Sequence, residues 1–149
     1  GGTHAILRCS WVVSAHGNNF VKTMLRLGAA REALTIIADQ IGAPTPARDL
    51  ARACLKMAQQ LQQDPGKSGT YHLQGTPEVS WAGFAREIFA QAEVACAVTD
   101  IPTTDYPTPA ARPLNSRLDC TALETVFGIS QPDWRQGLKD ILKDLGEEA

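Results

Sequence analysis

The chain has 149 residues, which is enough for one domain with a real hydrophobic core. Its hydrophobic content of 44% and charged content of 20% are ordinary for a globular protein. The formal net charge of −2 argues against nucleic acid or a membrane surface as a partner, because both favour a basic face. No apolar run approaches the roughly 18 residues of a membrane-spanning helix.

The four cysteines and three histidines show no metal-binding pattern. No Cys-x-x-Cys occurs, and no cysteine is paired with a histidine at metal-ligand spacing. We therefore expect no metal site and no disulfide, but reduced and mostly buried thiols in a cytoplasmic protein. These thiols are Cys9, Cys54, Cys96 and Cys120.

The first predicted unit is a strand, a loop and a helix. Residues His4–Trp11 are apolar with little alternation, which predicts a strand covered on both faces. Ser14–Gly17 is a predicted loop. Asn18 is the expected N-cap of the next helix, which Gly28 is expected to end.

A second strand and a long helix follow. Leu34–Ala38 is rich in β-branched residues and predicts a short strand, and 39–44 predicts an ordered loop. Thr45 is the expected cap of a helix with Pro46 at its first position. The predicted buried stripe of this helix is Leu50, Cys54, Met57 and Leu61, and the predicted solvated stripe is Arg48, Arg52 and Lys56.

The third part predicts a strand at Thr70–Gln74 and then a helix that begins near Ser80. That helix is expected to bury Trp81, Phe84, Ala85, Ile88 and Phe89. An extended segment is predicted at Val98–Ile101. Pro102–Pro113 holds four prolines and predicts irregular structure, and its Tyr106 and Arg112 suggest a docked loop rather than a flexible linker.

The last part predicts an edge strand at Asn115–Asp119, a helix at Thr121–Phe127 and a helix at Pro132–Leu145. The tail at 147–149 is expected to fray. Helices alternate with short strands along the chain, so the expected fold class is α/β or α+β.

Several catalytic motifs are missing from the sequence. No glycine fingerprint of a dinucleotide-binding fold follows the first strand. Gly66-Lys67-Ser68 resembles the end of a phosphate-binding loop, but Leu61 stands where that motif needs glycine. No Gly-x-Ser-x-Gly elbow occurs. Tyr71 and Tyr106 both lack a lysine four residues later, so no Tyr-x-x-x-Lys pair can form.

A set of binding residues remains. Asn18 and Asn19 stand at a predicted helix N-terminus, which favours an anion such as phosphate. Trp11 could stack on a sugar or base, and Arg112 offers a bidentate fork for a pyrophosphate. Gln40 follows the second strand. Each residue has a structural alternative: Asn18 as a cap only, Trp11 as core and Arg112 as a surface charge.

Three blocks carry a resemblance to a known family: RCSWVVSAHGNNFVKTMLRL from Arg8, LTIIADQIGAPTPARDLA from Leu34, and YPTPAARPLNSRL from Tyr106. They resemble the C-terminal half of dTDP-4-dehydrorhamnose reductases, which belong to the extended short-chain dehydrogenase/reductase superfamily. The resemblance implies that residues 1–149 form a substrate-binding domain. It also implies that the N-terminal Rossmann domain, with its Gly-rich loop and catalytic Tyr-x-x-x-Lys, lies outside this chain.

The resemblance implies reduction of the C4 keto group of dTDP-4-dehydro-L-rhamnose by NADPH or NADH. The chain alone would then bind no cofactor, contain no catalytic residue and be inactive. Trp11 is expected to contact the sugar, and Asn18 and Asn19 the diphosphate. Three further residues follow from the same family: Arg112 for the diphosphate, Asn115 for the ribose, and Gln40 for the lining of the site. Val13 departs from the family pattern, in which an aromatic residue is expected.

The expected partners are a dTDP-sugar, the N-terminal Rossmann domain and a second copy of the chain, which could pair with an uncovered first strand. Two other functions stay open. One is a non-catalytic relative similar to the regulatory subunit of methionine adenosyltransferase. The other is a sister nucleotide-sugar reductase or epimerase.

Overall fold

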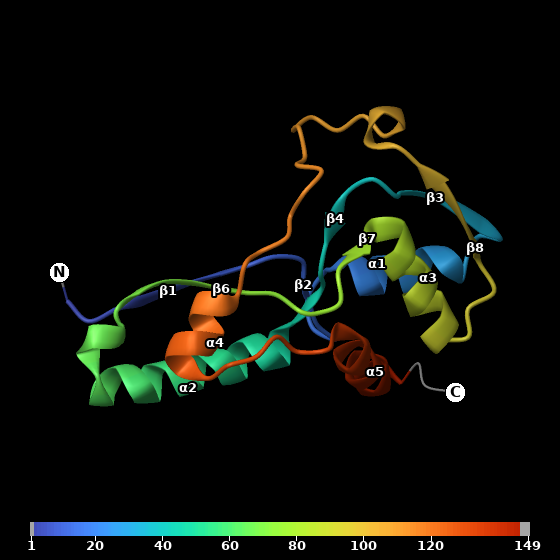
Figure 1. Ribbon diagram of the computed structural model, residues 1–149. Helices are drawn as coiled ribbons and strands as arrows, with labels where there is room; N and C mark the ends of the chain where they lie inside the picture. Colours follow the sequence, from blue (N-terminus) through green and yellow to red (C-terminus); the bar gives the residue numbers. More distant parts are fainter. Residues whose placement is uncertain (1, 147–149) are drawn as a thin grey trace.

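Pairs of short strands, rather than one wide sheet, organise the fold (Figure 1). The computed structural model describes residues 2–146. Three pairs are parallel and one is antiparallel, which with the helices gives the expected α/β class. The pairs are β1 (Ala5–Cys9) with β6 (Gly69–Leu73), β2 (Val12–Val13) with β5 (Thr45–Pro46), β3 (Ala33–Ile37) with β8 (Ala97–Ile101), and antiparallel β4 (Ile41–Gly42) with β7 (Val79–Ser80).

The helices divide the described residues into two lobes with separate cores. They are α1 (Phe20–Gly28), α2 (Ala47–Gln63), α3 (Trp81–Gln91), α4 (Thr121–Phe127) and α5 (Trp134–Leu145), with short 3-10 turns at η1 (Pro65–Lys67) and η2 (Thr103–Asp105). The α1–α3 lobe is the part built from α1, α3, α5 and the strand pair formed by β3 and β8. The β1–β6 lobe is the part built from the strand pair of β1 and β6 together with α2 and α4.

The core of the α1–α3 lobe is closed to solvent. Helix α3 is covered by α1, by α5 and by the β3–β8 pair. Of the five residues predicted to be buried on its inward face, Phe84, Ala85, Ile88 and Phe89 are buried, but Trp81 is only half-buried. Trp134 of α5 packs edge-on against Phe84 with ring centroids 5.2 Å apart, and its indole N–H donates to the carbonyl of Pro77. The polar end of this core tryptophan is thereby satisfied.

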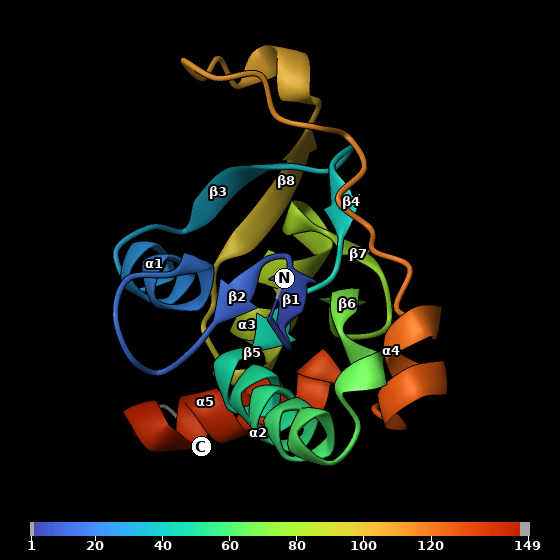
Figure 2. The same cartoon turned by 90° about the vertical axis from the view of Figure 1, so that its left-hand side faces the viewer.

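The β1–β6 lobe is covered on one face only. Figure 2 shows α2 beneath this strand pair and α4 beside β6. Ala5 and Leu7 pack on the core of this lobe, which contains Met57, Leu73 and Leu123. Successive side chains of a strand point to opposite faces, so Ile6 lies on the other face, where it is 52% exposed.

Two sequence predictions about this lobe are therefore wrong. The first strand was expected to be covered on both faces, but Ile6, Arg8 and Cys9 are exposed. The thiols were expected to be mostly buried, yet Cys9 and Cys54 are exposed and Cys96 is half-buried. Only Cys120 is buried among the four. The apolar composition of β1 thus marks a face that nothing in residues 2–146 covers.

Helix boundaries agree with the sequence where a cap has a strong chemical preference. Ser80 caps α3 by accepting a hydrogen bond from the amide of Gly83, and Gly128 ends α4 in the left-handed conformation. Two expected caps were wrong. Asn19, not Asn18, caps α1, and Pro46, not Thr45, precedes α2. The hydroxyl of Thr45 donates instead to the carbonyl of Ser10 at 2.6 Å.

A long connection joins the two lobes after β8 (Figure 1). Pro102–Pro113 is irregular apart from η2, as predicted. Its residues from 104 to 113 are exposed, although Tyr106 also contributes to the wall of a cavity. The strand expected at Asn115–Asp119 does not form. A single bridge joins Asn115 to Ile41 there. The tail predicted to fray, 147–149, lies outside the described residues.

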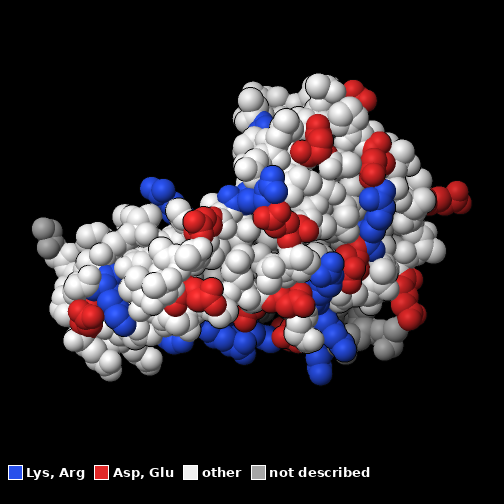
Figure 3. Space-filling view, viewed as in Figure 1, with Lys and Arg blue, Asp and Glu red and all other residues white. Residues whose placement is uncertain are grey.

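Among residues 2–146, no helix has the length and hydropathy needed to span a membrane. Positive and negative side chains are interspersed over the face seen in Figure 3, and the protruding connection at its top is mostly uncharged. The predicted solvated stripe of α2 is confirmed, because Arg48, Arg52 and Lys56 are exposed. Arg48 pairs there with Asp144 at 2.7 Å.

Candidate functional site

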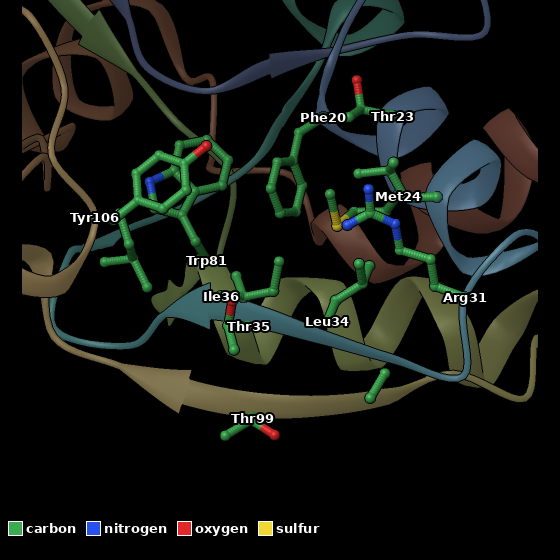
Figure 4. A pocket seen from close by; sticks show the side chains of 13 residues that line it. Phe20, Thr23, Met24, Arg31, Leu34, Thr35, Ile36, Trp81, Thr99 and Tyr106 are labelled. Atoms are coloured by element: carbon green, nitrogen blue, oxygen red, sulfur yellow. The ribbon is translucent and has the colours of Figure 1, made fainter.

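An open cavity of about 560 Å³ lies between α1 and β3 (Figure 4). Its size suits a small-molecule ligand. Side chains from α1, from β3 and from the start of α3 form its walls, and Tyr106 reaches it from the connection after β8. The lining residues are Phe20, Thr23, Met24, Leu27, Arg31, Ala33, Leu34, Thr35, Ile36, Ile37, Trp81, Thr99 and Tyr106.

The two ends of this cavity differ in chemistry. Trp81 and Tyr106 lie toward one end, and the guanidinium of Arg31 lies toward the other (Figure 4). Aromatic faces stack on planar rings or on the apolar face of a sugar. A guanidinium offers charge-assisted hydrogen bonds to carboxylate or phosphate. The cavity therefore suits a ligand that carries both a ring and an anionic group.

Trp11 stands beside the aromatic end of the cavity. Its backbone is left-handed, with φ at +46°, which is unusual for a bulky residue. Its carbonyl accepts a hydrogen bond from the amide of Thr45 at 3.0 Å. The indole stacks on Trp81 with ring centroids 3.6 Å apart and an interplanar angle of 16°. Trp11 thus has one face occupied by Trp81 and stays half-exposed.

Gly42 makes room for the Trp11 indole. A Cβ at position 42 would lie 2.8 Å from Cε2 of Trp11 and 3.0 Å from its Cζ2. Real Cβ atoms do not approach other atoms that closely, so any other residue would displace the indole. The absence of a side chain on β4 therefore helps to define where the indole lies.

The N-terminus of α1 uses its two asparagines differently. Asn19 caps the helix: its Oδ1 accepts from the amide of Lys22, and its Nδ2 donates to the carbonyl of Ser14 at 2.6 Å. The side chain of Asn19 is therefore committed to the loop. Asn18 is exposed beside it. Phe20 follows at once and packs against Trp81 with centroids 4.6 Å apart, so the helix start lies next to the aromatic end.

Gln40 is buried and holds the long connection in place. Its Nε2 donates to the hydroxyl of Thr103 at 3.1 Å. The neighbouring carboxylate of Asp39 accepts from the hydroxyl of Thr103 at 2.6 Å and from its amide. These hydrogen bonds from Thr103 hold the pKa of Asp39 below its ordinary value. The root of the loop that carries Tyr106 and Arg112 is thereby fixed.

Asn115 and Arg112 lie farther along this connection. The amide of Ile41 donates to the carbonyl of Leu114, and Ser116 donates back to Ile41, both at 2.8 Å. Oδ1 of Asn115 accepts from Nε of Arg117 at 2.9 Å. Arg112 is exposed on the protruding part of the connection. The structure thus joins Asn115 to β4, while Arg112 stands away from the cavity wall.

Most of the predicted site residues adjoin the cavity without lining it, whereas Arg112 is exposed on the connection. Trp11, Gln40 and Asn115 are linked through β4, and Asn18 and Asn19 begin the helix that forms one wall. None of the six predicted residues is part of the lining itself. Sequence reasoning took Trp81 for a core residue of its helix and did not identify Arg31. Only Tyr106, an aromatic residue among prolines, gave a signal that could have identified a lining residue.

The segment after β1 lacks one feature of dinucleotide-binding folds. Strand β1 is followed by Ser10-Trp11-Val12 and not by the glycine turn that lets a pyrophosphate approach a helix N-terminus. In the described part of the chain, no three His, Cys, Asp or Glu side chains group closely enough to hold a metal ion. The site as observed can bind and orient a ligand by stacking, hydrogen bonds and charge.

The described residues form an α/β domain with an open cavity lined in part by aromatic side chains. The chain belongs to the RmlD substrate-binding domain family, whose model matches residues 1–147. The family resemblance inferred from the three sequence blocks is therefore confirmed.

Named relatives agree with this membership. The chain is 42% identical over 145 residues to a dTDP-4-dehydrorhamnose reductase of Sinorhizobium fredii strain NGR234, which covers 93% of this chain and 49% of that protein. It is 41% identical over 148 residues to the dTDP-4-dehydrorhamnose reductase of Escherichia coli K12, and the match covers 95% of this chain and 50% of that protein. The chain therefore spans about half the length of the curated relatives it matches.

Solved structures of dTDP-4-dehydrorhamnose reductases also match this chain over about half of their length. A dTDP-4-dehydrorhamnose reductase from Clostridium acetobutylicum superimposes with a TM-score of 0.86 at 36% identity, covering 95% of this chain and 49% of that one. The corresponding enzyme from Bacillus anthracis, solved in complex with NADP, gives a TM-score of 0.81 at 37% identity. That match covers 95% of this chain and 48% of the Bacillus chain. The fold of residues 2–146 is thus that of one half of these reductases.

Proposed function

We propose that this chain is the substrate-binding part of a dTDP-4-dehydrorhamnose reductase, which reduces the C4 keto group of dTDP-4-dehydro-L-rhamnose with NADPH or NADH. The observation that carries the proposal is the 41–42% identity to enzymes of that name over more than nine-tenths of the chain. The cavity supports it, since a nucleotide-sugar carries rings, and the cavity offers the aromatic faces of Trp81 and Tyr106.

The proposed roles are those that the family resemblance implies, adapted to where each residue lies. Trp11, half-exposed beside the cavity, contacts the sugar. Asn18 and the free amides at the start of α1 receive the diphosphate, while Asn19 acts by holding that helix end in shape. Arg112 approaches the diphosphate from the exposed connection. Asn115 meets the ribose, and Gln40 supports the site by fixing the root of that connection.

The proposal assigns the cofactor to a separate part of the enzyme. Residues 1–149 form the substrate-binding domain, and a dinucleotide-binding domain outside these residues holds the nicotinamide and the catalytic tyrosine. The nicotinamide supplies the hydride, and this chain orients the keto carbon toward it. The uncovered face and edge of β1 are where that second domain, or a second copy of the chain, packs. We place the enzyme in the cytoplasm.

Two measurements test this function. Calorimetry should show that the protein, in the full length its gene encodes, binds dTDP-L-rhamnose at least tenfold more tightly than UDP-sugars. Residues 1–149 alone should show no turnover of NADH or NADPH. Preference for a UDP-sugar would favour a sister enzyme. Binding without turnover in the full-length protein would favour a non-catalytic relative.

A further inference from the structure

Trp81 lies at the boundary between the core of the α1–α3 lobe and the cavity. It is the first residue of α3, fixed there because Ser80 caps the helix. The other inward residues of this helix, such as Phe84 and Ile88, are fully buried, whereas Trp81 is half-buried. One face of its indole meets Trp11, and the side chain also forms part of the cavity wall.

The orientation of Trp11 depends on its neighbours. A left-handed backbone at a bulky residue persists only where the surroundings hold it. The amide of Thr45 holds the Trp11 carbonyl, and Gly42 leaves space on one side of the indole. The remaining constraint is the stack on Trp81, whose near-parallel rings at 3.6 Å fix the plane of the indole.

Trp81 is in turn held from behind. Phe20 packs against it at 4.6 Å, and Phe20 stacks on the fully buried Phe84 at 5.5 Å. The aromatic series Phe84–Phe20–Trp81–Trp11 therefore runs from the core of the α1–α3 lobe to the half-exposed indole. Phe20 and Trp81 both line the cavity, so a ligand in the cavity touches the residues that set the Trp11 plane.

We propose that Trp81 is a positioning residue for sugar binding: by stacking on Trp11 it fixes the indole that receives the sugar of a nucleotide-sugar. This inference rests on the proposed function. Its chemistry is simple, because an indole held in one plane binds a sugar face without first losing rotational freedom. Loss of Trp81 then weakens the contribution of the sugar to binding more than the contribution of the nucleotide.

The test compares the affinity for dTDP-L-rhamnose with the affinity for dTDP by calorimetry, using the protein in the full length its gene encodes. The dissociation constant of dTDP divided by that of dTDP-L-rhamnose measures the contribution of the sugar to binding. We expect Trp81→Leu to lower this ratio at least fivefold, and Trp81→Phe, which keeps an aromatic face, to leave it within about twofold of the wild-type value.

Trp134→Phe is the matched control. Trp134 is another tryptophan of the aromatic core: it packs against Phe84, is buried and lies outside the cavity lining. This variant should lose stability and keep the wild-type ratio. Circular dichroism supplies an independent readout, because two stacked indoles give an exciton signal. That signal should disappear in Trp81→Leu and persist in Trp134→Phe.

The outcomes separate the two proposals. If the wild-type protein binds dTDP-L-rhamnose normally and Trp81→Leu keeps the ratio, the positioning role is wrong and the proposed function stands. An exciton signal that survives Trp81→Leu also overturns the positioning role. If the wild-type protein binds dTDP-L-rhamnose no better than UDP-sugars, the proposed function fails, and the positioning role fails with it.

Discussion

The two lobes bury their apolar residues to different degrees. In the α1–α3 lobe, helix α3 is enclosed on several sides and its inward residues are fully buried. In the β1–β6 lobe, helices cover one face of a two-stranded sheet, and Ile6 on the other face is 52% exposed. The ligand cavity lies in the closed lobe. The difference leaves an apolar strand face uncovered in the β1–β6 lobe, and the proposed function places a further domain or a second copy there.

The largest expected effect concerns the two cores. Phe84→Ala should lower the free energy of unfolding by about 3–5 kcal/mol, because it leaves a cavity in a closed core. Ile6→Ala should cost less than about 1 kcal/mol, since half of that side chain already meets water. Urea denaturation of both variants measures the difference. Equal losses would mean that the two lobes are not distinct in packing.

The next effect concerns the position of the indole. Gly42→Ala places a Cβ 2.8 Å from Cε2 of Trp11, which must then move. Such crowding costs about 1–3 kcal/mol, and we expect dTDP-L-rhamnose to bind about tenfold more weakly. Gly2→Ala is the control, because nothing lies within 4 Å of a Cβ there. Unchanged affinity in Gly42→Ala would contradict the place given to Trp11.

A third prediction addresses the open surface of β1. Residues 1–149 on their own should associate through β1, and Ile6→Lys should weaken that association at least tenfold, since lysine on an exposed strand opposes pairing. Its free energy of unfolding should change by less than about 0.5 kcal/mol. Sedimentation velocity measures the association. Leu55→Lys, at a 67% exposed position on α2, should associate as the wild type does.

A wild-type chain that sediments as a monomer at all concentrations would contradict the use of β1 by a second copy. If Leu55→Lys and Ile6→Lys weakened association equally, the contact would not be specific to the strand. The two variants therefore distinguish the two surfaces of this lobe.

The smallest effect concerns the root of the long connection. Because the folded pKa of Asp39 is lowered, the stabilisation from its bonds to Thr103 is present above the unfolded pKa of about 3.9. It is lost as the pH falls through the lower folded pKa. NMR relaxation at Thr103 should therefore show more motion at about pH 2 than at about pH 6.

Asp39→Asn should show this motion already near neutral pH, whereas Asp105→Asn, on the same connection, should behave as the wild type. An Asp39→Asn variant in which Thr103 stays rigid would show that Gln40 alone holds the connection.

Local chemistry made part of this structure predictable. Ser80 has a strong capping preference and Gly128 a strong tendency to end a helix, so both boundaries were correct. Asn18 and Asn19 have the same side chain, and composition cannot say which of them faces the helix end. Coverage of both faces of β1 was wrongly predicted. An apolar strand sequence indicates that its faces are buried, but it does not show whether the covering residues belong to the same segment of chain.

The candidate site was harder to predict. The stack of Trp11 on Trp81 joins residues 70 positions apart, and their contact follows from the packing of α3 against α1 rather than from any local pattern. The same holds for Arg31, which reaches the cavity only because the turn before β3 places it there. Trp11 was singled out because it was expected to end a strand, where ligands meet an α/β fold. It lies in the bend between β1 and β2, and its role in binding stays a prediction.

Hydrogen–deuterium exchange of the protein with and without dTDP-L-rhamnose tests most directly whether the closed lobe holds the ligand. We predict protection at Trp11, at the start of α1, at the start of α3 and along the connection after β8, with little change in α2 and α4. Protection concentrated in α2 and α4, with none around Trp11 and Trp81, would contradict the assignment of the nucleotide-sugar to the α1–α3 lobe.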